Sequence, residues 1–558
     1  MSARRATNGR DSTAKASPAS RARVPQAFLG AIDMEVRLGT SNDFITPSLA
    51  CVKPVQIDTS KKNRVLRLEG MEDDTDAAAA DAAPKTAKVT LNDCLACAGC
   101  ITSAETVMVE QQSIGEFERM LTAGAHDVFI VSLSASSRAA MAVHLGLGLR
   151  ETHGRLTSFL KGLGCHCVLD CGVASYLGLM QSAAEFIYRF RAATATATAT
   201  STGGGGAEAL PLPLLTSSCP GWVCYAEKLH GEAVLRHLSR VKSPQQIAGS
   251  LLKHGYASTM GIAPERLCHV TIMPCFDKKL EASRDDFFDA TAGAHGSRDV
   301  DCVLSTAEVL QLCEQRGCAN LDTAPPSSPD VDPPFSALHA STAPGGSGGG
   351  GDSAAAVAVD VSDAAASIGL SSMSSMVTDG FTYAAPGASG GHADFVYRCA
   401  ARELFGVDVG AGALPWVAGR NADLQELTLE KEGVAVLRFV RAYGFRNIQN
   451  IVRRVKGGKS PYHFVELMAC PGGCANGGGQ PRPPSIEAPG RTAAVEAKLV
   501  DAAEACAVDP REQPCVRALY ADGAFLAGGP LGAACQQHLL TSFHAVDPAK
   551  QNPLTISW

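Results

Sequence analysis

The sequence lacks any apolar run long enough to cross a membrane. Its longest apolar stretch, residues 128–149, is interrupted by Arg138 and His144, whereas a spanning helix needs roughly 20 consecutive apolar residues. It also lacks an excess of charge of one sign, because 49 lysines and arginines face 56 aspartates and glutamates. This balance indicates neither a nucleic acid nor an anionic membrane as a partner. With 46% hydrophobic residues, the sequence predicts a soluble protein with a sizeable core.

No apolar segment follows the first arginines, so the sequence predicts no secretory signal peptide. Residues 1–25 carry five arginines against one aspartate, among serines and alanines. This composition fits a disordered cytosolic tail or, less well, an organelle transit peptide. Twenty cysteines among 558 residues are too few for a disulfide-stapled secreted scaffold. In a reducing compartment, many cysteines usually indicate bound metal.

Two stretches of low complexity divide the chain. Residues 193–206 alternate alanine and threonine before four glycines and predict a spacer, and residues 321–384 are rich in proline, serine and glycine and predict a disordered insertion. The predicted parts are a disordered tail (1–26), an N-terminal cluster segment (27–121), a first α/β lobe (122–320), a second α/β lobe (385–495) and a C-terminal segment (496–558).

Within the lobes, strand and helix patterns alternate. Apolar runs at residues 127–133, 267–273 and 462–468 predict buried strands. The last two are each followed by a proline-containing turn with a cysteine, and loops at the carboxyl ends of parallel strands are where α/β proteins hold ligands.

The sequence also predicts where one helix begins. Ser243 is its expected N-cap, Pro244 lies in its first turn, and Gln246 follows three residues after the cap. Ile247, Leu251 and Leu252 then form its apolar stripe.

The first cysteine motif is Cys94-x-x-Cys97-x-x-Cys100. Thiolates at this spacing can bind three irons of one cubane cluster. Ala104 stands where a bacterial ferredoxin motif has its next cysteine, so the fourth ligand must come from elsewhere, and Cys51 is the candidate. A zinc site is the less favoured alternative, because zinc prefers paired Cys-x-x-Cys or Cys/His spacings.

The second set of cysteines is scattered over three predicted loops. Cys219 lies in TSSCPGW, Cys275 in MPCFDKKLE, and Cys470 with Cys474 in ELMACPGGCANGGGQP. Glycines beside the last pair allow backbone N–H groups to point at cluster sulfurs. Spacing alone therefore makes a second 4Fe–4S site plausible. A shorter group of cysteines, Cys165, Cys167 and Cys171 around His166, is expected to lie in the core rather than to bind metal.

These three segments resemble the signature segments of iron-only hydrogenases. Together with LNDCLACAGC and Cys51, they resemble most closely the hydrogenase-like cytosolic iron–sulfur assembly factors, also called the nuclear prelamin A recognition factor-like family. The resemblance implies an α/β fold with two lobes and parallel sheets around a buried cluster, plus a ferredoxin-like N-terminal cluster segment. It also implies two 4Fe–4S clusters, one held by the N-terminal set and one by the second set: Cys51, Cys94, Cys97 and Cys100, and Cys219, Cys275, Cys470 and Cys474.

One residue distinguishes this chain from the hydrogenases and favours the assembly factors. Hydrogenases carry a proton-delivering cysteine where this chain has Ser218, and a serine hydroxyl is a poor proton relay near neutral pH. The accessory clusters of most hydrogenases are also missing, although Lys278 and Glu281 keep positions that surround the di-iron centre in that family. The sequence therefore predicts a hydrogenase-like pocket without hydrogenase catalysis.

The expected function is a non-catalytic carrier or adaptor in cytosolic iron–sulfur protein assembly. The resemblance implies an early scaffold, a late targeting complex and client apoproteins as partners, in the cytoplasm and, as a second location, the nucleus. The alternatives are a hydrogenase and a redox-sensing interaction protein whose clusters only stabilise its fold.

The last three residues, Ile556, Ser557 and Trp558, resemble the tripeptide by which this family and some clients engage the targeting complex. A terminal indole and carboxylate suit a docking peptide. The alternative is that Trp558 folds back onto the protein, because large aromatic side chains are rarely left exposed.

Overall fold

The computed structural model describes residue 109 and residues 111–199, 210–293, 296–319, 321, 391–410, 412–482, 488–505 and 509–546. The first predicted cluster motif, the predicted insertion beyond residue 321 and the C-terminal tripeptide lie outside these residues. None of the helices in the described ranges is long and apolar enough to cross a membrane.

The first sheet has four parallel strands in the order β2-β1-β4-β7. They are β1 (Val128–Leu133), β2 (Cys167–Asp170), β4 (Leu267–Met273) and β7 (Cys302–Ser305). Every residue of β1 and β4 is buried, which explains why both appear in the sequence as unbroken apolar runs. The two strands predicted here are confirmed, and β1 begins one residue later than expected.

Helices cover both faces of this sheet, because alternate side chains of each strand enter different cores. Phe129 and Val131 enter one core and Val128 and Ile130 the other. The first core also contains residues of α3 (Ile114–Thr122), α4 (Ala135–Leu145), α5 (Leu149–Gly162) and α12 (Thr306–Gln315). The second contains residues of α6 (Gly172–Ala199), α9 (Pro244–Ser250) and α14 (His392–Phe405).

The second sheet has five strands in the order β3-β11-β10-β9-β8. They are β3 (Leu214–Thr216), β11 (Phe464–Met468), β10 (Val434–Tyr443), β9 (Leu424–Lys431) and β8 (Val417–Ala418). β3, β11 and β10 run parallel to one another, whereas β9 is antiparallel to β10 and β8 is antiparallel to β9. The strand predicted at 462–468 is confirmed, although it begins at Phe464. Because β3 precedes β4 in the chain, the two sheets are interleaved along the sequence.

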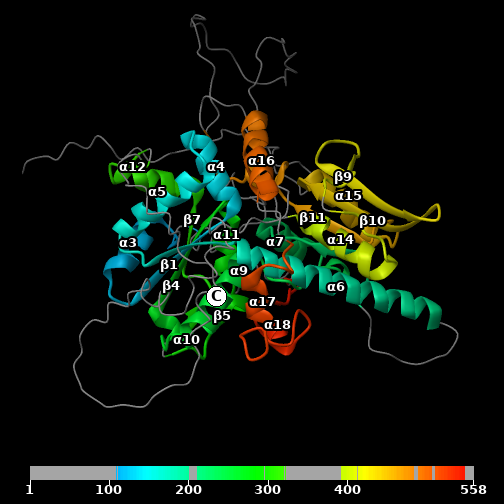
Figure 1. The fold of residues 1–558 in the computed structure, drawn as a ribbon, viewed down its shortest axis with the longest axis horizontal. Helices are drawn as coiled ribbons and strands as arrows, with labels where there is room; N and C mark the ends of the chain where they lie inside the picture. Colours follow the sequence, from blue (N-terminus) through cyan, green and yellow to red (C-terminus); the bar gives the residue numbers. More distant parts are fainter. Residues whose placement is uncertain are drawn as a thin grey trace, which may run out of the picture.

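Figure 1 shows the two sheets on opposite sides of the molecule, with α7 (Pro220–Leu229) and α11 (Asp277–Ala282) between them. The second sheet packs on α7, α8 (Glu232–Leu235) and α15 (Phe445–Lys456) with one face and on α6 and α14 with the other. The other elements are a π-helix (Leu251–Tyr256), α10 (Ala257–Thr259), β5 (Phe288–Asp289), β6 (Ser297–Arg298), α16 (Ala488–Ala505), α17 (Pro514–Tyr520) and α18 (Ala533–His538).

The spacer predicted at 193–206 is wrong for residues 193–199, because α6 continues to Ala199; residues 200–206 lie outside the described residues. Alanine has the highest helix propensity, and extending an existing helix is much easier than starting one. The earlier turns of α6 are anchored by buried Tyr176, Leu177 and Phe186. The alternating alanines and threonines therefore prolong a helix that tertiary packing has already formed.

Helix α9 begins at Pro244 as predicted, and the apolar stripe of Ile247, Leu251 and Leu252 is fully buried. The predicted side-chain cap is wrong, since the Ser243 side chain makes no capping hydrogen bond. Its hydroxyl instead donates to the buried carboxylate of Glu281, 3.0 Å away. A charged acceptor makes a stronger hydrogen bond than a backbone amide.

Most cysteines outside the second predicted set are core residues. Cys165 and Cys167 belong to different cores on opposite faces of the first sheet, and Cys171 belongs to a third cluster. The nearby His166 ring accepts a hydrogen bond from the Phe129 N–H at 3.0 Å. The expectation that this group is core is confirmed for all three thiols. Also buried are Cys268, Cys302, Cys313, Cys318, Cys399, Cys515 and Cys535.

Candidate iron–sulfur cluster site

Cys219 stands where β3 turns into α7. It is the N-cap residue of α7, whose first position is Pro220, and proline suits that position because its missing N–H has no helical partner there. The hydroxyl of Ser217 fixes the turn by accepting the Cys219 N–H at 3.0 Å and donating to the carbonyl of Leu467 at 2.6 Å. Ser217 therefore ties the Cys219 loop to β11, the strand that precedes Cys470.

The Cys219 thiol is buried, and its pKa is raised to about 12. Burial is the largest cause and the negative charges that Asp277 and Cys474 would carry add to it, whereas the backbone N–H groups of Ala469 and Trp222 act in the opposite direction and lower the pKa. N–H groups beside a sulfur favour its thiolate form, which is the form that binds iron. The turn thus prepares Cys219 for a metal partner.

Cys275 follows β4 and precedes α11. Burial raises the pKa of its thiol well above the ordinary value, and the charges of Asp277, Cys219, Cys474 and Cys470 would raise it further. The other three thiols of the second predicted set therefore lie within electrostatic range of Cys275. The sequence placed these four cysteines in one site, and the fold brings them together.

The loop that carries Cys470 and Cys474 packs directly on the Cys275 loop. The Gly479 N–H donates to the carbonyl of Pro274 at 2.9 Å. A Cβ at Gly477 would lie 2.3 Å from the same carbonyl oxygen, closer than real side chains come to backbone. The amide of Gln480 donates to the carbonyl of Cys474 at 3.2 Å. The glycines in this loop are thus required because two backbones approach each other closely.

No three His, Cys, Asp or Glu side chains in the described part of the chain are grouped to hold a single metal ion. The ligands of a cubane bind four different irons and stand farther apart than the ligands of one ion. The four residues offer all-sulfur donors; Cys219 and Cys275 are buried, Cys470 and Cys474 are partly buried, and backbone N–H groups lie beside the Cys219 sulfur. The residues present therefore fit a 4Fe–4S cluster.

A buried charge pair lies beside the thiols. Lys278 Nζ is 2.7 Å from the Glu281 carboxylate, which also accepts hydrogen bonds from Ser243 and Gln245. Burial alone would lower the pKa of Lys278, but Glu281 and, to a lesser extent, Cys275 and Cys474 raise it overall. Lys278 therefore places a positive charge where thiolates and a cluster would be negative.

Ser218 contacts a histidine that no sequence motif indicated. Its hydroxyl lies 3.4 Å from Nε2 of His392, and Nδ1 of the same ring lies 3.1 Å from the hydroxyl of Ser182. His392 is buried at the start of α14, and burial lowers its pKa. The helix is held there by Glu466 of β11, which accepts the Ala393 N–H at 2.7 Å. A lone histidine after a low-complexity segment carries no recognisable pattern.

Comparisons with known proteins place this site in a family. The family described as iron only hydrogenase large subunit, C-terminal domain, matches residues 127–478. Cytosolic iron-sulfur assembly component 3 of Pongo abelii is 40% identical over 95% of this chain and 99% of its own length. The chain belongs to the hydrogenase-like family of cytosolic iron–sulfur assembly components. Another similar protein, named NAR1 in Arabidopsis thaliana, is 38% identical over 92% of this chain and 96% of its own length.

Solved structures similar to this assembly-family chain are hydrogenases. The apo FeFe-hydrogenase from Chlamydomonas reinhardtii is 25% identical, with a TM-score of 0.57 over 80% of this chain and 99% of its own. The predicted hydrogenase-like α/β fold is confirmed. The ferredoxin-like N-terminal segment, with Cys51, Cys94, Cys97 and Cys100, lies outside the described residues.

Proposed function

We propose that this chain carries two 4Fe–4S clusters and links an early scaffold of cytosolic iron–sulfur protein assembly to the late targeting complex that loads client apoproteins. The observation that carries the proposal is the convergence of four thiols, two of them buried, in a fold whose relatives are named cytosolic iron–sulfur assembly components. The expected location is the cytoplasm, without nucleic acid or membrane as direct partners.

Two sets of thiols would hold the clusters. The second cluster would be held by Cys219, Cys275, Cys470 and Cys474, and the first by Cys51, Cys94, Cys97 and Cys100. When bound, each cluster supplies an iron–sulfur unit for transfer or electron exchange. Lys278 offsets negative charge beside the second site, and Ser217 and Gln480 hold its loops in register.

The chain is proposed to be an adaptor rather than an enzyme. The hydroxyl of Ser218 stands where hydrogenases have a proton-delivering cysteine and lies 3.4 Å from Nε2 of His392. A serine hydroxyl is a poor proton relay near neutral pH. The alternative, an iron-only hydrogenase, is favoured only by the fold and by the Lys278–Glu281 pair.

Infrared spectroscopy separates these two functions. After anaerobic reconstitution, we expect no absorption in the stretching region of CO and CN⁻ ligands and no H₂ release from reduced dye. Bands in that region together with H₂ release would establish the hydrogenase and remove the adaptor proposal.

The terminal tripeptide Ile556, Ser557 and Trp558 is proposed as the docking element for the targeting complex. In cells depleted of their own relative, the full chain is expected to restore a cytosolic enzyme that requires a 4Fe–4S cluster. Deleting Trp558 should weaken capture of the targeting complex roughly thirtyfold, because a buried tryptophan anchor can contribute about 2 kcal/mol. Restoration should fall while the iron content of the variant stays unchanged.

The matched control is Trp558→Phe, which keeps an aromatic anchor and should bind better than the deletion. Undiminished capture after deletion would contradict the docking role. Loss of iron in the deleted protein would favour the alternative in which Trp558 packs on the protein. Failure of the full chain itself to restore the enzyme would contradict the assembly function.

A further inference from the structure

Residues 433–465 carry charge of one sign. They include seven arginines and lysines and no aspartate or glutamate, although the chain as a whole has a net charge of −7. The centre of this stretch is α15, whose apolar residues are buried: Phe445, Ile448, Ile451, Val452 and Val455. The outer side of α15 is therefore left to its cations.

Four exposed cations form what we call the basic face: Arg446, Arg453, Lys456 and Lys459. Arg453 and Lys456 return to nearly the same side of the helix as Arg446, because they follow it by about two and about three turns. Lys459 follows just after the end of α15. Arg454 is not part of this face, because its side chain forms a hydrogen bond with Tyr462.

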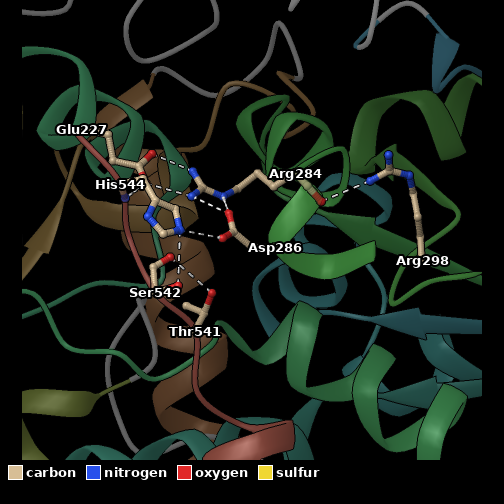
Figure 2. A network of polar contacts seen from close by, with 7 residues as sticks. All are labelled: Glu227, Arg284, Asp286, Arg298, Thr541, Ser542 and His544. Atoms are coloured by element: carbon tan, nitrogen blue, oxygen red, sulfur yellow. Dashed lines mark hydrogen bonds and ion pairs between the residues drawn. The ribbon is translucent and has the colours of Figure 1, made fainter. Parts of the chain in front are cut away.

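The basic face lacks the carboxylate partners that other arginines of the protein have. On the exposed surface, Arg316 pairs with Glu118 at 2.6 Å. Figure 2 shows the partly buried Arg284 between Glu227 and Asp286, at 2.7 and 2.8 Å. Within the described residues, by contrast, no cation of the basic face forms an ion pair. Its positive charge is open to a partner from outside.

Helix stability explains only part of the basic face. Cations in the last turn of a helix interact favourably with the helix dipole, and Arg453 and Lys456 lie there. Arg446 lies in the first turn, where the dipole disfavours a cation and where α15 has no acidic residue. The charge of Arg446 thus opposes the stability of its own helix, which points to a use outside the helix.

The end of α15 that carries Arg446 adjoins the second cluster site. A Cβ at Gly444, the N-cap of α15, would lie 3.3 Å from the ring of Pro471, so the helix begins against the loop of Cys470 and Cys474. These two thiols are also the partly exposed ones of their set, whereas the other two are buried. A partner on the basic face would therefore lie beside the accessible edge of the site.

The basic face suits a protein surface rich in aspartate and glutamate. Guanidinium groups bind carboxylates through paired hydrogen bonds, and complementary charges speed docking and fix its orientation. DNA and anionic membranes are less suitable partners, because they extend beyond the basic face over a chain of net charge −7 that repels them. An acidic patch on a protein can be small enough to meet the basic face alone.

We propose that the basic face docks an acidic surface of a partner protein and holds that partner beside Cys470 and Cys474. Charged, small interfaces are typical of brief encounters such as electron transfer, and they suit a partner that reaches the site and then leaves. The inference rests on the proposed second cluster for its purpose, and it names the chemistry of a partner for that cluster. The docking itself requires only the basic face.

The test uses the full chain without iron and two synthetic peptides that carry a bromoacetyl group, one of glutamate and glycine and one of serine and glycine. A docked peptide alkylates a nearby thiol, which mass spectrometry of the digested protein identifies. We expect the acidic peptide to label Cys470 or Cys474 about tenfold faster than the neutral peptide at low salt, and equally fast at high salt. Cys224 is also partly exposed but lies near Arg284 and Glu227, and it should react equally with both peptides.

Arg446→Glu together with Arg453→Glu should abolish the preference for the acidic peptide. Arg446→Gln together with Arg453→Gln should reduce it without placing a carboxylate in the last turn of α15. The matched control is Arg119→Glu with Arg316→Glu, which reverses two exposed arginines that already pair with Glu116 and Glu118 and should keep the preference. Circular dichroism checks that each variant is folded.

Equal labelling by the two peptides in the parent, or an unchanged preference in the folded glutamate variant, would overturn the docking face. The predicted insertion, residues 322–384, holds seven aspartates and no lysine or arginine. A preference that arises only after its deletion would show that the insertion occupies the face, and would overturn the external partner. Stronger suppression of labelling by a DNA duplex or phosphatidylserine vesicles than by unreactive acidic peptide would overturn it too. Since these proteins hold no iron, failed reconstitution would contradict the cluster proposal alone.

Discussion

Replacing Cys474 with alanine is expected to lower the iron and acid-labile sulfide of the reconstituted protein from about eight to about four per chain. Cys474 would hold one corner of the second cluster, and without it the cubane would lose one of its four thiolate ligands. Cys97→Ala should remove the other half, because no nearby cysteine can take its place. Iron and sulfide analysis of each purified variant measures both losses.

The control for this experiment is Cys313→Ala, which removes a thiol buried in the core on the far face of the first sheet. It should keep about eight irons per chain, although it leaves a small core cavity. A Cys474→Ala protein with full iron content would contradict the assignment of the second cluster. Full iron in Cys51→Ala would show only that the fourth N-terminal ligand is another group.

The Gly477→Ala substitution is expected to remove the second cluster without removing any thiol. The new methyl group would lie 2.3 Å from the carbonyl oxygen of Pro274, so the loop of Cys474 must move away from the loop of Cys275. Backbone on both sides cannot yield as a flexible side chain would, and overpacking of this kind costs about 1–3 kcal/mol. Because a rigid cubane requires its four thiolates in fixed positions, we expect about four irons per chain to be lost.

Gly162→Ala is the matched control for this glycine substitution. Gly162 is the last residue of α5, and an added Cβ there meets no atom within 4 Å. This variant should keep its iron and be slightly more stable, because alanine favours a helix over glycine. If Gly477→Ala kept full iron with an unchanged absorption spectrum of the cluster, the close packing of the two loops would not be needed to position the ligands.

The candidate site could be predicted from the sequence because its ligands lie in strongly marked local patterns. Cys219, Cys275 and Cys470 each adjoin a proline at the end of an apolar run, so each could be placed on a loop at the carboxyl end of a strand. Buried strands could be predicted in the same way, since β4 occupies the same residues as its apolar run. Patterns of this kind depend on neighbouring residues only.

The parts that could not be predicted depend on residues far apart in the chain. The contact between Ser218 and His392 joins positions separated by the whole predicted insertion. The hydroxyl of Ser243 was expected to cap its own helix, but in the folded protein it donates a hydrogen bond to the carboxylate of Glu281 instead. α6 extends through an alanine–threonine run because the body of the protein anchors its earlier turns. Local sequence propensity cannot reveal any of these long-range contacts.

The pairing of β3 with β11 has a consequence for how the protein is made. This ladder joins Leu214 to Phe464, 250 residues later in the chain, so the turn bearing Cys219 has no supporting strand until β11 has been synthesised. At roughly 5–20 residues per second, that delay lasts roughly 10–50 s on the ribosome. The four thiols of the second set thus cannot assemble on a nascent chain that ends before Cys474. The proposed second cluster can therefore form only after translation has passed Cys474, whereas the cysteines at positions 51–100 emerge well before.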